Sequence, residues 1–330
     1  MDIVQVGIIG CGWFGNVHLD NLLKMEQVRV TALVSSNAQK LAETAAKVPW
    51  AKLYTDYHEL FSQERQLDAV LVCVPPDSHG DIELLVAANG VHLYVEKPVA
   101  LSLERAHEIE KAIHSAGVLC SCGYHERYSP AMEELKAFLA AHPAVIASGQ
   151  WLGAMPGAPW WRVKARSGGQ LVEQSTHIFD LLRYFFGEVR TVYSTSVPHL
   201  LDEAPGCDIE GASVTNITFE NGVAATVQTG CFFGENVSGR VGVQFFCRDA
   251  TVEYDWMQEV RYITKSSTEK RPARFPSHFN AVQAFINAVR NNNAQLIRSP
   301  YEDAVKTLAV TLAADRSLNT GEPVKLETMR

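Results

Sequence analysis

The sequence predicts a two-domain α/β protein, with a parallel sheet covered by helices on both faces followed by a domain built on an antiparallel sheet. Three observations lead to this prediction. The first third of the chain alternates short apolar, β-branched runs with helix-like stretches, a glycine-rich turn joins the first run to the first helix, and longer alternating segments come later. Because the pattern changes after Gly123, we expect domains at residues 1–123 and 124–330.

The elements of the first domain follow in order. Parallel strands are buried on both faces and therefore read as continuous apolar runs. Gly90 and Gly117 fit left-handed helix caps, and Ser102 fits a helix start. The expected strands are Val4–Ile9, Val28–Ser35, Ala69–Val74, His92–Glu96 and Val118–Cys122, and the expected helices lie near Phe14–Met25, Ala38–Lys47, Asp81–Ala88 and Leu103–Ser115.

The second domain is expected to contain long strands between helices. The Asn221–Gly222 pair is a strong two-residue hairpin signal, and Arg248–Asp249 is a weaker one. The expected elements are a helix from Ser129–Pro130 to Ala141, the strand Val145–Trp151, a loop at 153–169, a helix at about Leu171–Phe186, the strands Val189–Val197, Ala212–Phe219, Val223–Gly230, Arg240–Phe246 and Thr251–Trp256, and closing helices at about Ser277–Arg290 and Tyr301–Asn319.

Composition excludes several classes of protein. A chain that is 47% hydrophobic and 20% charged is typical of a globular protein, and a net charge of −8 without a basic run argues against a nucleic-acid partner. The apolar runs Ala69–Pro76 and Leu308–Ala314 are too short to span a membrane, and the first residues do not resemble a signal peptide, so we expect a cytoplasmic protein. Seven scattered cysteines favour neither a disulfide framework nor a metal site.

The glycine-rich turn points to a phosphate ligand. Gly10-Cys11-Gly12-Trp13-Phe14-Gly15 follows the first strand and opens the first helix, which is the setting in which GxGxxG binds a dinucleotide. Gly10 permits the tight turn, Gly12 lets the pyrophosphate approach the backbone, and Gly15 allows helix and strand to pack closely. The helix N-terminus, where Trp13 and Phe14 begin, then faces the anion.

The end of the second strand favours NADP over NAD as cofactor, with NAD still possible. An NAD site usually has an acid about 20 residues past the glycine motif, and this chain has Ser35 there, followed by Ser36, Asn37 and Lys40. Two hydroxyls, a helix N-terminus and an ammonium make an anion site for a 2′-phosphate. Alternatively, Ser36 or Asn37 caps the helix and Lys40 is a solvated charge, and both interpretations can hold together.

With these motifs the chain resembles the Gfo/Idh/MocA oxidoreductases, which pair a Rossmann domain, a doubly wound parallel sheet, with an α/β domain on an open, mostly antiparallel sheet. The resemblance runs nearly end to end. It rests on the GxGxxG turn, Ala69–Pro76 followed by His79, Glu96-Lys97-Pro98, the stretch from Gly123 to Pro130, and Gly168-Gly169 ahead of Glu173 and His177. The turn from Ser35 to Lys40 is similar to that of glucose–fructose oxidoreductase, an NADP-using member.

The resemblance implies an activity and site residues. The family mostly oxidises or reduces a secondary alcohol of sugars, cyclitols and related polyols with a pyridine nucleotide. Its catalytic lysine, acid and histidine correspond to Lys97, Glu173 and His177, with Glu173 in place of the usual aspartate. Positions near the cofactor are Val74, Pro75, His79, Glu96 and His125, the last in place of a common asparagine.

The residue types suit this chemistry. Hydride transfer from a carbinol carbon needs a group that takes the hydroxyl proton and a cation that stabilises the alkoxide, roles that His177 and Lys97 can fill. Glu173, at i,i+4 from His177 on the expected helix, either binds the substrate hydroxyl or orients the imidazole. His125 bonds the cofactor amide, carries a proton or closes the corner after the strand, and His79 either contacts the cofactor or caps a loop.

Further residues bear on substrate and assembly. Trp160, Trp161 and Arg162 offer aromatic faces and a cation for a carbohydrate-like ligand, although core packing is expected for at least one tryptophan. Arg127 either contacts substrate or cofactor or pairs with an acid. The resemblance also implies a homodimer or homotetramer formed through the C-terminal sheet. Two alternative functions stay open: a redox-neutral glycosidase that uses bound NAD, and a non-catalytic dinucleotide sensor.

Overall fold

A computed structural model describes residues 3–64, 66–201, 203–234 and 236–329. The chain divides into two compact units, residues 1–128 with 276–305 (unit 1) and residues 129–275 with 306–330 (unit 2). The sequence-based division assigned all of 124–330 to the second domain. In the structure, residues 124–128 and 276–305 belong to unit 1. The physical reason is apolar burial, because Phe285 and Ile286 of the segment 276–305 lie in the core of unit 1 with Leu19.

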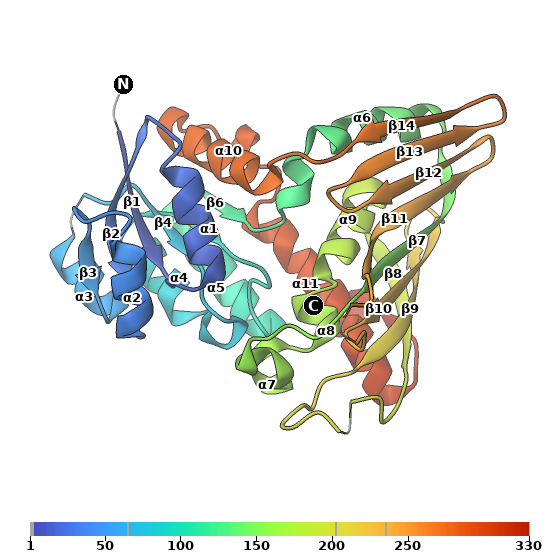
Figure 1. Ribbon diagram of the computed structural model, residues 1–330, viewed down its shortest axis with the longest axis horizontal. Helices are drawn as coiled ribbons and strands as arrows, with labels where there is room; N and C mark the ends of the chain where they lie inside the picture. Colours follow the sequence, from blue (N-terminus) through green and yellow to red (C-terminus); the bar gives the residue numbers. More distant parts are fainter. Residues whose placement is uncertain (1–2, 65, 202, 235, 330) are drawn as a thin grey trace. The chain divides into compact units, whose positions relative to one another are not determined.

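Unit 1 is built on a six-stranded sheet in the order β3-β2-β1-β4-β5-β6, and every neighbouring pair is parallel (Figure 1). This confirms the predicted doubly wound sheet. The chain order reverses between β1 and β4, which is where open α/β sheets bind ligands. The strands are β1 (Val4–Ile9), β2 (Val28–Val34), β3 (Lys52–Tyr54), β4 (Ala69–Val72), β5 (His92–Val95) and β6 (Cys120–Cys122).

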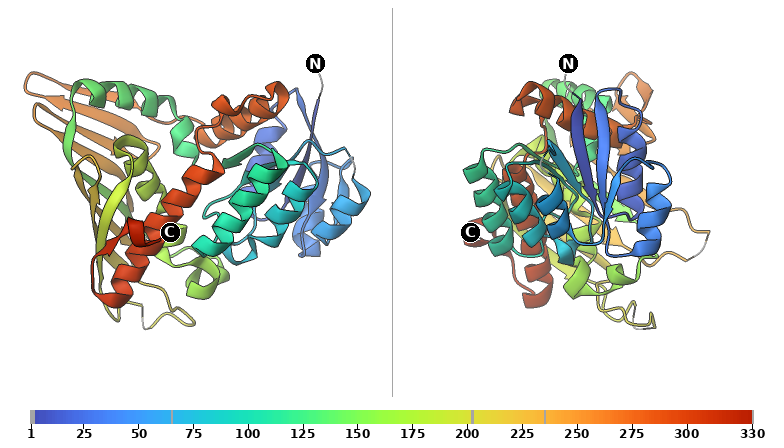
Figure 2. Two further views of the ribbon diagram at one scale, coloured as in Figure 1. Left: turned by 180° about the vertical axis from the view of Figure 1, so that it is seen from behind. Right: turned by 90° about the vertical axis from the view of Figure 1, so that its left-hand side faces the viewer.

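Helices cover both faces of this sheet (Figure 2). The helices α1 and α10 pack against each other, and so do α4 and α5. Ser102 caps α5 by accepting a hydrogen bond from the Arg105 backbone N–H at 3.2 Å, as expected. The helical elements are α1 (Trp13–Leu22), α2 (Ala38–Ala45), α3 (Tyr57–Gln63), η1 (Pro76–Ser78), α4 (Asp81–Ala88), α5 (Leu103–Ala116), η2 (His125–Tyr128), α10 (Ser277–Asn291) and η4 (Ala294–Leu296).

Unit 2 is built on a nine-stranded sheet in the order β14-β13-β12-β11-β7-β10-β9-β8-β15. Among the described strands of this sheet only β7 and β10 pair in parallel, so the expected mostly antiparallel sheet is confirmed. Both hairpins form as expected, with Gly222 at φ +87° in the first. The strands are β7 (Ala144–Leu152), β8 (Val189–Ser196), β9 (Ala212–Phe219), β10 (Ala224–Gly230), β11 (Arg240–Cys247), β12 (Ala250–Asp255), β13 (Glu259–Thr264), β14 (Thr268–Pro272) and β15 (Val324–Lys325).

Among the described residues, four strands and two α-helices were absent from the sequence-based assignment: β3, β13, β14, β15, α3 and α7 (Lys164–Ser167), the last lying in the expected loop at 153–169. The strands β3 and β15 are only three and two residues long, which leaves no periodic pattern to read. All residues of β14 are exposed and three of its five side chains are charged, so it lacks the apolar alternation of a half-buried strand.

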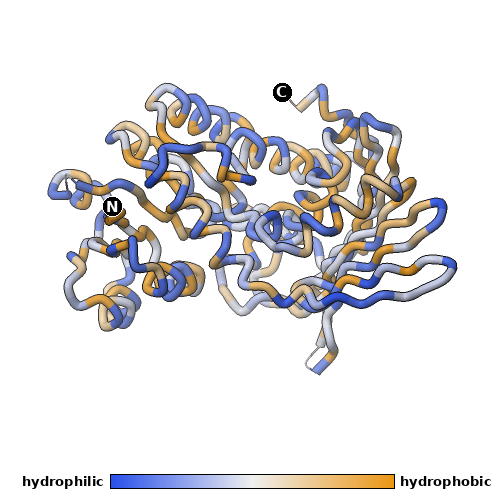
Figure 3. Tube along the Cα trace, turned by 90° about the horizontal axis from the view of Figure 1, so that it is seen from above, coloured by the Kyte–Doolittle hydropathy of each residue, from blue (hydrophilic) through white to orange (hydrophobic). Residues whose placement is uncertain are grey.

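One face of the second sheet packs on helices. Ile178 and Phe179 of α9 and Ala313 of α11 join Val227 and Phe245 in a single apolar cluster. Figure 3 shows hydropathy alternating along these strands. The helical elements of unit 2 are α6 (Pro130–Ala141), η3 (Pro159–Arg162), α7 (Lys164–Ser167), α8 (Gln170–Glu173), α9 (Thr176–Phe186) and η5 (Leu326–Met329), and α11 (Tyr301–Thr320) runs across the division of the chain.

The predicted continuous helix Leu171–Phe186 is wrong, because the chain forms two helices, α8 and α9, with a break at Gln174 and Ser175. The Ser175 backbone N–H bonds to the Gln170 carbonyl at 3.0 Å, five residues back, and the Ser175 hydroxyl donates to the same oxygen at 2.9 Å. This local bonding replaces the i→i−4 ladder of a regular helix. Across the described residues, none of the helices combines the length and the apolar character of a membrane span.

Candidate functional site

The three glycines of the turn between β1 and α1 differ in the space that surrounds them. Gly10 has φ +104°, and a Cβ on it would lie 2.2 Å from the Cys73 carbonyl oxygen. A Cβ on Gly15 would lie 1.9 Å from the Gly10 carbonyl oxygen. A Cβ on Gly12, by contrast, would meet no atom within 4 Å. Packing therefore requires Gly10 and Gly15, whereas Gly12 leaves the backbone at the N-terminus of α1 open to an anion.

The corner after β2 carries the residues predicted to choose between dinucleotides. Asn37 caps α2, because its Oδ1 accepts a hydrogen bond from the Lys40 backbone N–H at 3.0 Å. The Ser35 hydroxyl oxygen accepts from the Asn37 backbone N–H at 3.3 Å. The capping role is thus confirmed for Asn37, and the side chains of Ser36 and Lys40 remain exposed beside it.

The segment after β4 lies beside the glycine turn, since a Cβ on Gly10 would come within 3.3 Å of Val74. Beyond Pro75, the His79 Nδ1 lies 2.5 Å from Glu83 Oε1, and the other oxygen of this carboxylate accepts from the Gly80 backbone N–H at 2.6 Å. His79 Nε2 is buried without a hydrogen-bond partner among the described residues. A ligand group that reached this nitrogen would satisfy it.

A buried contact between a histidine and a carboxylate lies next to Lys97, directly after β5. Glu96 Oε1 lies 2.7 Å from His18 Nε2, and Glu96 Oε2 accepts from the Lys97 backbone N–H at 3.3 Å. Burial alone raises the pKa of the Glu96 carboxyl, but the His18 hydrogen bond and the nearby Lys97 charge hold this pKa below its ordinary value. A Cβ on Gly123 would lie 2.6 Å from Glu96 Oε2, so a side chain there would displace the Glu96 carboxylate.

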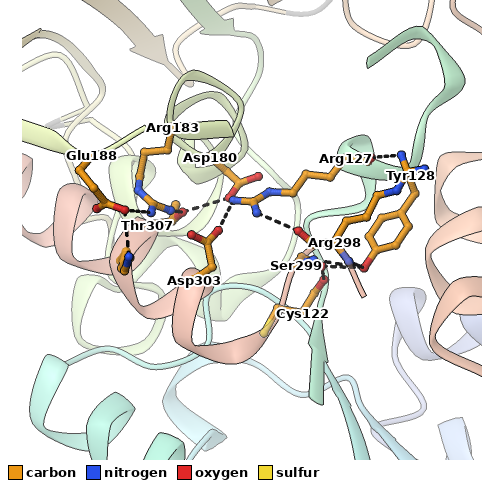
Figure 4. A network of polar contacts seen from close by, with 11 residues as sticks. Cys122, Arg127, Tyr128, Asp180, Arg183, Glu188, Arg298, Ser299, Asp303 and Thr307 are labelled. Carbon is orange, nitrogen blue, oxygen red and sulfur yellow. Dashed lines mark hydrogen bonds and ion pairs between the residues drawn. The ribbon is translucent and has the colours of Figure 1, made fainter. Parts of the chain in front are cut away.

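The residues of η2 are buried and held from α10 and the segment after it. The Arg127 guanidinium lies 2.6 Å from Asp303 Oδ2 and donates to the Arg298 carbonyl at 3.0 Å (Figure 4). These contacts match the structural alternative for Arg127, which pairs it with an acid. His125 Nδ1 lies 2.9 Å from the Ser277 hydroxyl oxygen, and the His125 ring stacks on His278 at 3.6 Å between centroids.

In unit 2 the candidate acid and base lie on either side of the helix break. Glu173 is the last residue of α8 and His177 is the second residue of α9, so the expected i,i+4 pair on one continuous helix is wrong. Glu173 Oε2 instead accepts a hydrogen bond from Trp161 Nε1 at 2.5 Å. Trp161 therefore fixes the orientation of this carboxylate.

Two tryptophans from the sheet surround His177. Trp151 of β7 stacks on the imidazole at 5.5 Å and 18°, and Trp256, after β12, meets it edge-on at 5.5 Å and 60°. The two indole rings lie 5.3 Å apart. Only 6% of His177 is exposed, so its ring orientation is set by these aromatic contacts.

The aromatic loop predicted to face the substrate is mostly core. Trp161 is 1% exposed and packs with Ile209 and Cys231, which confirms the expectation of core packing for one tryptophan. Trp160 is partly buried against the same cluster. Arg162 Nε is buried and has no hydrogen-bond partner within the described part of the chain.

Sequence reasoning missed the residues that support the site from a distance. His18 follows Gly15 by three residues, and its position on the buried side of α1 was a usable signal. Ser277 and His278 are about 150 residues from their partner in sequence, and Trp151 and Trp256 looked like ordinary strand residues. Only the tertiary fold brings these side chains to the candidate site.

Each unit thus carries its own set of candidate functional groups. Unit 1 presents a glycine cradle, a buried carboxylate and a lysine at the carboxyl ends of parallel strands. Unit 2 presents an imidazole between two indoles and a carboxylate held by a third. These groups can bind a dinucleotide, stabilise an oxyanion and move a proton.

Comparison with known proteins gives matches over most of the chain. A family model described as "Oxidoreductase family, NAD-binding Rossmann fold" matches residues 4–124, and one described as "GFO/IDH/MocA C-terminal domain" matches residues 144–253. The chain is 26% identical over 340 residues to the myo-inositol 2-dehydrogenase of Thermotoga maritima, across 98% of this chain and 99% of that protein. It is 27% identical over 346 residues to the scyllo-inositol 2-dehydrogenase (NAD(+)) of Bacillus subtilis, across 99% and 97%.

A solved structure gives the same result for the fold. An oxidoreductase from Agrobacterium radiobacter, in complex with NAD+, L-tartaric acid and magnesium, matches with a TM-score of 0.87 at 16% identity and covers 99% of each chain. The likeness extends over both units, and it shows that this chain and the solved structure have the same fold.

Proposed function

This chain belongs to the Gfo/Idh/MocA family of NAD-binding oxidoreductases, and we propose that it transfers a hydride between a nicotinamide dinucleotide and a secondary alcohol or ketone of a sugar, cyclitol or related polyol. The observation that carries the proposal is the pairing of an open glycine cradle with Glu96-Lys97 at the same edge of one parallel sheet. The two inositol dehydrogenases, each matched almost end to end, support the substrate class.

The dinucleotide fits the residues of unit 1. Gly12 leaves room for the pyrophosphate, Gly10 and Gly15 shape the turn, and the unpartnered His79 Nε2 can receive a hydrogen bond from the cofactor. Trp13, Phe14, Val74, Pro75, Glu96 and His125 complete the proposed cofactor site. When bound, the nicotinamide accepts or supplies the hydride.

We favour NADP as the cofactor, with NAD also accepted. Ser35, Ser36 and Lys40 stand where an NAD site usually has an acid, and the exposed Ser36 hydroxyl and Lys40 ammonium lie at the N-terminus of α2. Asn37 belongs to this site through its cap, which holds the turn in place. A 2′-phosphate would meet positive charge there and no carboxylate from these four residues.

The proposed chemistry divides between three side chains. Lys97 polarises the substrate oxygen and stabilises the alkoxide, while His177 takes the hydroxyl proton during oxidation and returns it during reduction. Glu173 binds the neighbouring hydroxyl in an orientation fixed by Trp161. Trp151 and Trp256 hold the His177 ring and present apolar faces to the C–H surface of a ring-shaped substrate. Trp160 and Arg162 are further candidate substrate contacts in unit 2, and the buried Arg127, paired with Asp303, would support the candidate site of unit 1.

We also propose a homodimer or homotetramer formed through the outer face of the second sheet. Ile146 is 52% exposed and Phe246 is 38% exposed, although both lie in regular strands. On the four central strands β11, β7, β10 and β9, two cross-strand rows on this face are uncharged, which is typical of the centre of a protein interface, whereas Glu253 and Arg261 continue the second row on β12 and β13. The two uncharged rows comprise Phe246, Ile146, Ala224 and Thr218 in one row and Gln244, Ser148, Thr226 and Asn216 in the next.

The test is a turnover panel. The purified protein is incubated with NADP+ or NAD+ and a set of inositols, aldoses and anhydrosugars, and absorbance is followed at the reduced nicotinamide band. We expect net reduction with at least one alcohol and a higher kcat/KM with NADP+. Hydrolysis of a glycoside without net reduction would contradict the proposal, and so would nucleotide binding without any reaction across the panel and its keto forms.

A further inference from the structure

Glu210, shortly before β9, is a buried carboxylate of unit 2 that the proposed chemistry does not use. Its side chain is 6% exposed. Its Oε1 accepts a hydrogen bond from the Leu171 backbone N–H, in the first turn of α8, at 2.9 Å. The first N–H groups of a helix have no partner inside the helix, and Leu171 is fully buried, so Glu210 satisfies a donor that water does not reach. Glu210 therefore fixes the start of α8.

The surroundings of Glu210 show which of its oxygens acts on α8. Gly169, the residue before α8, has φ +86°, and a Cβ on it would lie 2.7 Å from Glu210 Oε2. This second oxygen has no hydrogen-bond partner among the described residues. Lys164 Nζ lies 3.9 Å from it and makes its shorter contact with Asp315 Oδ1 of α11, at 2.5 Å. Glu210 therefore acts on α8 through the hydrogen bond of Oε1.

The two residues directly before Glu210 hold Trp161, which donates to Glu173 Oε2 at 2.5 Å. Ile209 packs with Trp161 in one apolar cluster. The Asp208 backbone N–H donates to the backbone carbonyl one residue after Trp161, at 3.1 Å. The segment 208–210 thus holds both the indole that bonds to Glu173 and the first turn of the helix that carries Glu173.

The other end of α8 is closed by local bonding. The Gln170 carbonyl accepts from the backbone N–H groups of Gln174 and Ser175 at 3.2 and 3.0 Å, and from the Ser175 hydroxyl at 2.9 Å. With four residues, α8 is a single turn, and an isolated turn of this length is not stable in water. Its place in unit 2 therefore depends on contacts such as the one from Glu210.

We propose that Glu210 is a positioning residue for Glu173, the carboxylate proposed to bind the substrate. By holding the first turn of α8, Glu210 keeps the carboxylate at the end of this helix in the place where it meets both Trp161 and the substrate hydroxyl. The inference rests on the proposed function, because it requires that Glu173 binds the substrate. Since small displacements of a substrate-binding group lower the rate, loss of the Glu210 bond is expected to reduce turnover and to leave cofactor affinity unchanged.

The test separates the acceptor oxygen of Glu210 from its charge. Glu210→Gln keeps an oxygen within reach of the Leu171 N–H and removes the charge, whereas Glu210→Asp keeps the charge and shortens the side chain by about 1.5 Å. For the best alcohol of the turnover panel, kcat/KM is measured at saturating NADP+. We expect a loss of about five-fold in Glu210→Asp and of less than about two-fold in Glu210→Gln, with unchanged NADPH affinity in both. The exposed Glu220→Asp, directly after β9, is the matched control and should keep the full rate.

A second comparison shows whether Glu210 acts through Glu173. In Glu173→Ala protein, the further change Glu210→Asp should alter kcat/KM by less than about two-fold, because the side chain that Glu210 positions is absent. An equal loss with and without Glu173, a full rate in Glu210→Asp, or a five-fold loss in Glu210→Gln would overturn the inference and leave the proposed function intact. Failure of Glu210→Asp to fold would show a structural role and would also overturn the inference. Absence of turnover by the unmodified protein would overturn both.

Discussion

The candidate site residues of unit 1 and those of unit 2 are positioned in opposite ways. In unit 1, the glycine turn, the Ser35 corner and Lys97 each follow a parallel strand directly, so their places at one sheet edge come from local chain order. In unit 2, His177 and Glu173 are placed by a helix break and by tryptophans from β7, η3 and the turn after β12. Local sequence motifs position the candidate residues of unit 1, whereas contacts between distant segments position those of unit 2.

The largest effect is expected from removing the two groups proposed to act on the substrate. Lys97→Ala and His177→Ala should each lower kcat by ~10²-fold or more, because the first loses alkoxide stabilisation and the second loses the proton acceptor. NADPH affinity should change little. The exposed Lys111→Ala, on α5, is the control. If either variant kept its turnover, the role assigned to that residue would be contradicted.

Within the glycine turn, Gly15 is expected to serve packing and Gly12 to serve cofactor binding. A Cβ at position 15 meets the Gly10 carbonyl at 1.9 Å, so Gly15→Ala should destabilise the protein by about 2–4 kcal/mol and weaken NADPH binding as well. Gly12→Ala faces open space and should leave stability within about 0.5 kcal/mol, yet weaken NADPH binding by ~10-fold or more. Thermal melts and titrations check this, and a destabilised Gly12→Ala would argue against an open cradle.

Cofactor choice is expected to depend on the corner after β2. Ser35→Asp places a carboxylate where it can bond a ribose 2′-hydroxyl and repel a 2′-phosphate, so the NADP/NAD ratio of kcat/KM should fall by about ten-fold. Ser62→Asp, on the exposed side of α3, serves as a charge-matched control. An unchanged ratio in Ser35→Asp would reject this placement of the 2′-phosphate.

The next effect concerns the Trp161–Glu173 hydrogen bond, a tertiary contact that orients the candidate carboxylate of unit 2. Trp161→Phe keeps an aromatic ring in the core but releases the carboxylate, which should lower kcat about five-fold. Glu173→Gln should cost at least as much, and the double variant should be less impaired than the product of the two effects. Additive effects would mean that Trp161 does not act through Glu173.

The smallest expected effect concerns stability and pH. Because the pKa of His278 is lowered to about 3 in the folded state, the unfolded chain binds a proton below about pH 6.5 that the native protein does not bind. This costs stability as pH falls from about 6.5 towards 3, and amounts to about 1 kcal/mol at pH 5.5. His278→Phe should lose less stability than the unmodified protein between about pH 7.5 and 5.5 in urea titrations. Equal losses would contradict the assignment.

The contrast between the units also explains what could be predicted from the sequence. Val4–Ile9, Asp81–Ala88 and Ala212–Phe219 were expected with the bounds they have, because continuous apolar runs, a helix closed by glycine and strict alternation are local signals. The order of strands in each sheet and the return of 276–305 to unit 1 depend on contacts between distant segments.

Among the site residues, the same distinction holds. The Asn37 cap and the packing of Gly15 follow from residues three to five positions apart. The break before His177 depends on how Ser175 bonds to Gln170, and a periodic apolar pattern does not reveal it. Ser277 and His278 belong to no recognisable motif, yet both contact the His125 ring from α10.

The most direct test of the central claim follows the hydrogen itself. The alcohol with the highest rate in the turnover panel is labelled with deuterium at its carbinol carbon and incubated with NADP+. We predict that the deuterium appears on the nicotinamide ring, that the rate falls on labelling, and that Lys97→Ala and His177→Ala abolish the transfer. Reduced dinucleotide without deuterium, or deuterium released to solvent, would contradict direct hydride transfer from the alcohol to the nicotinamide.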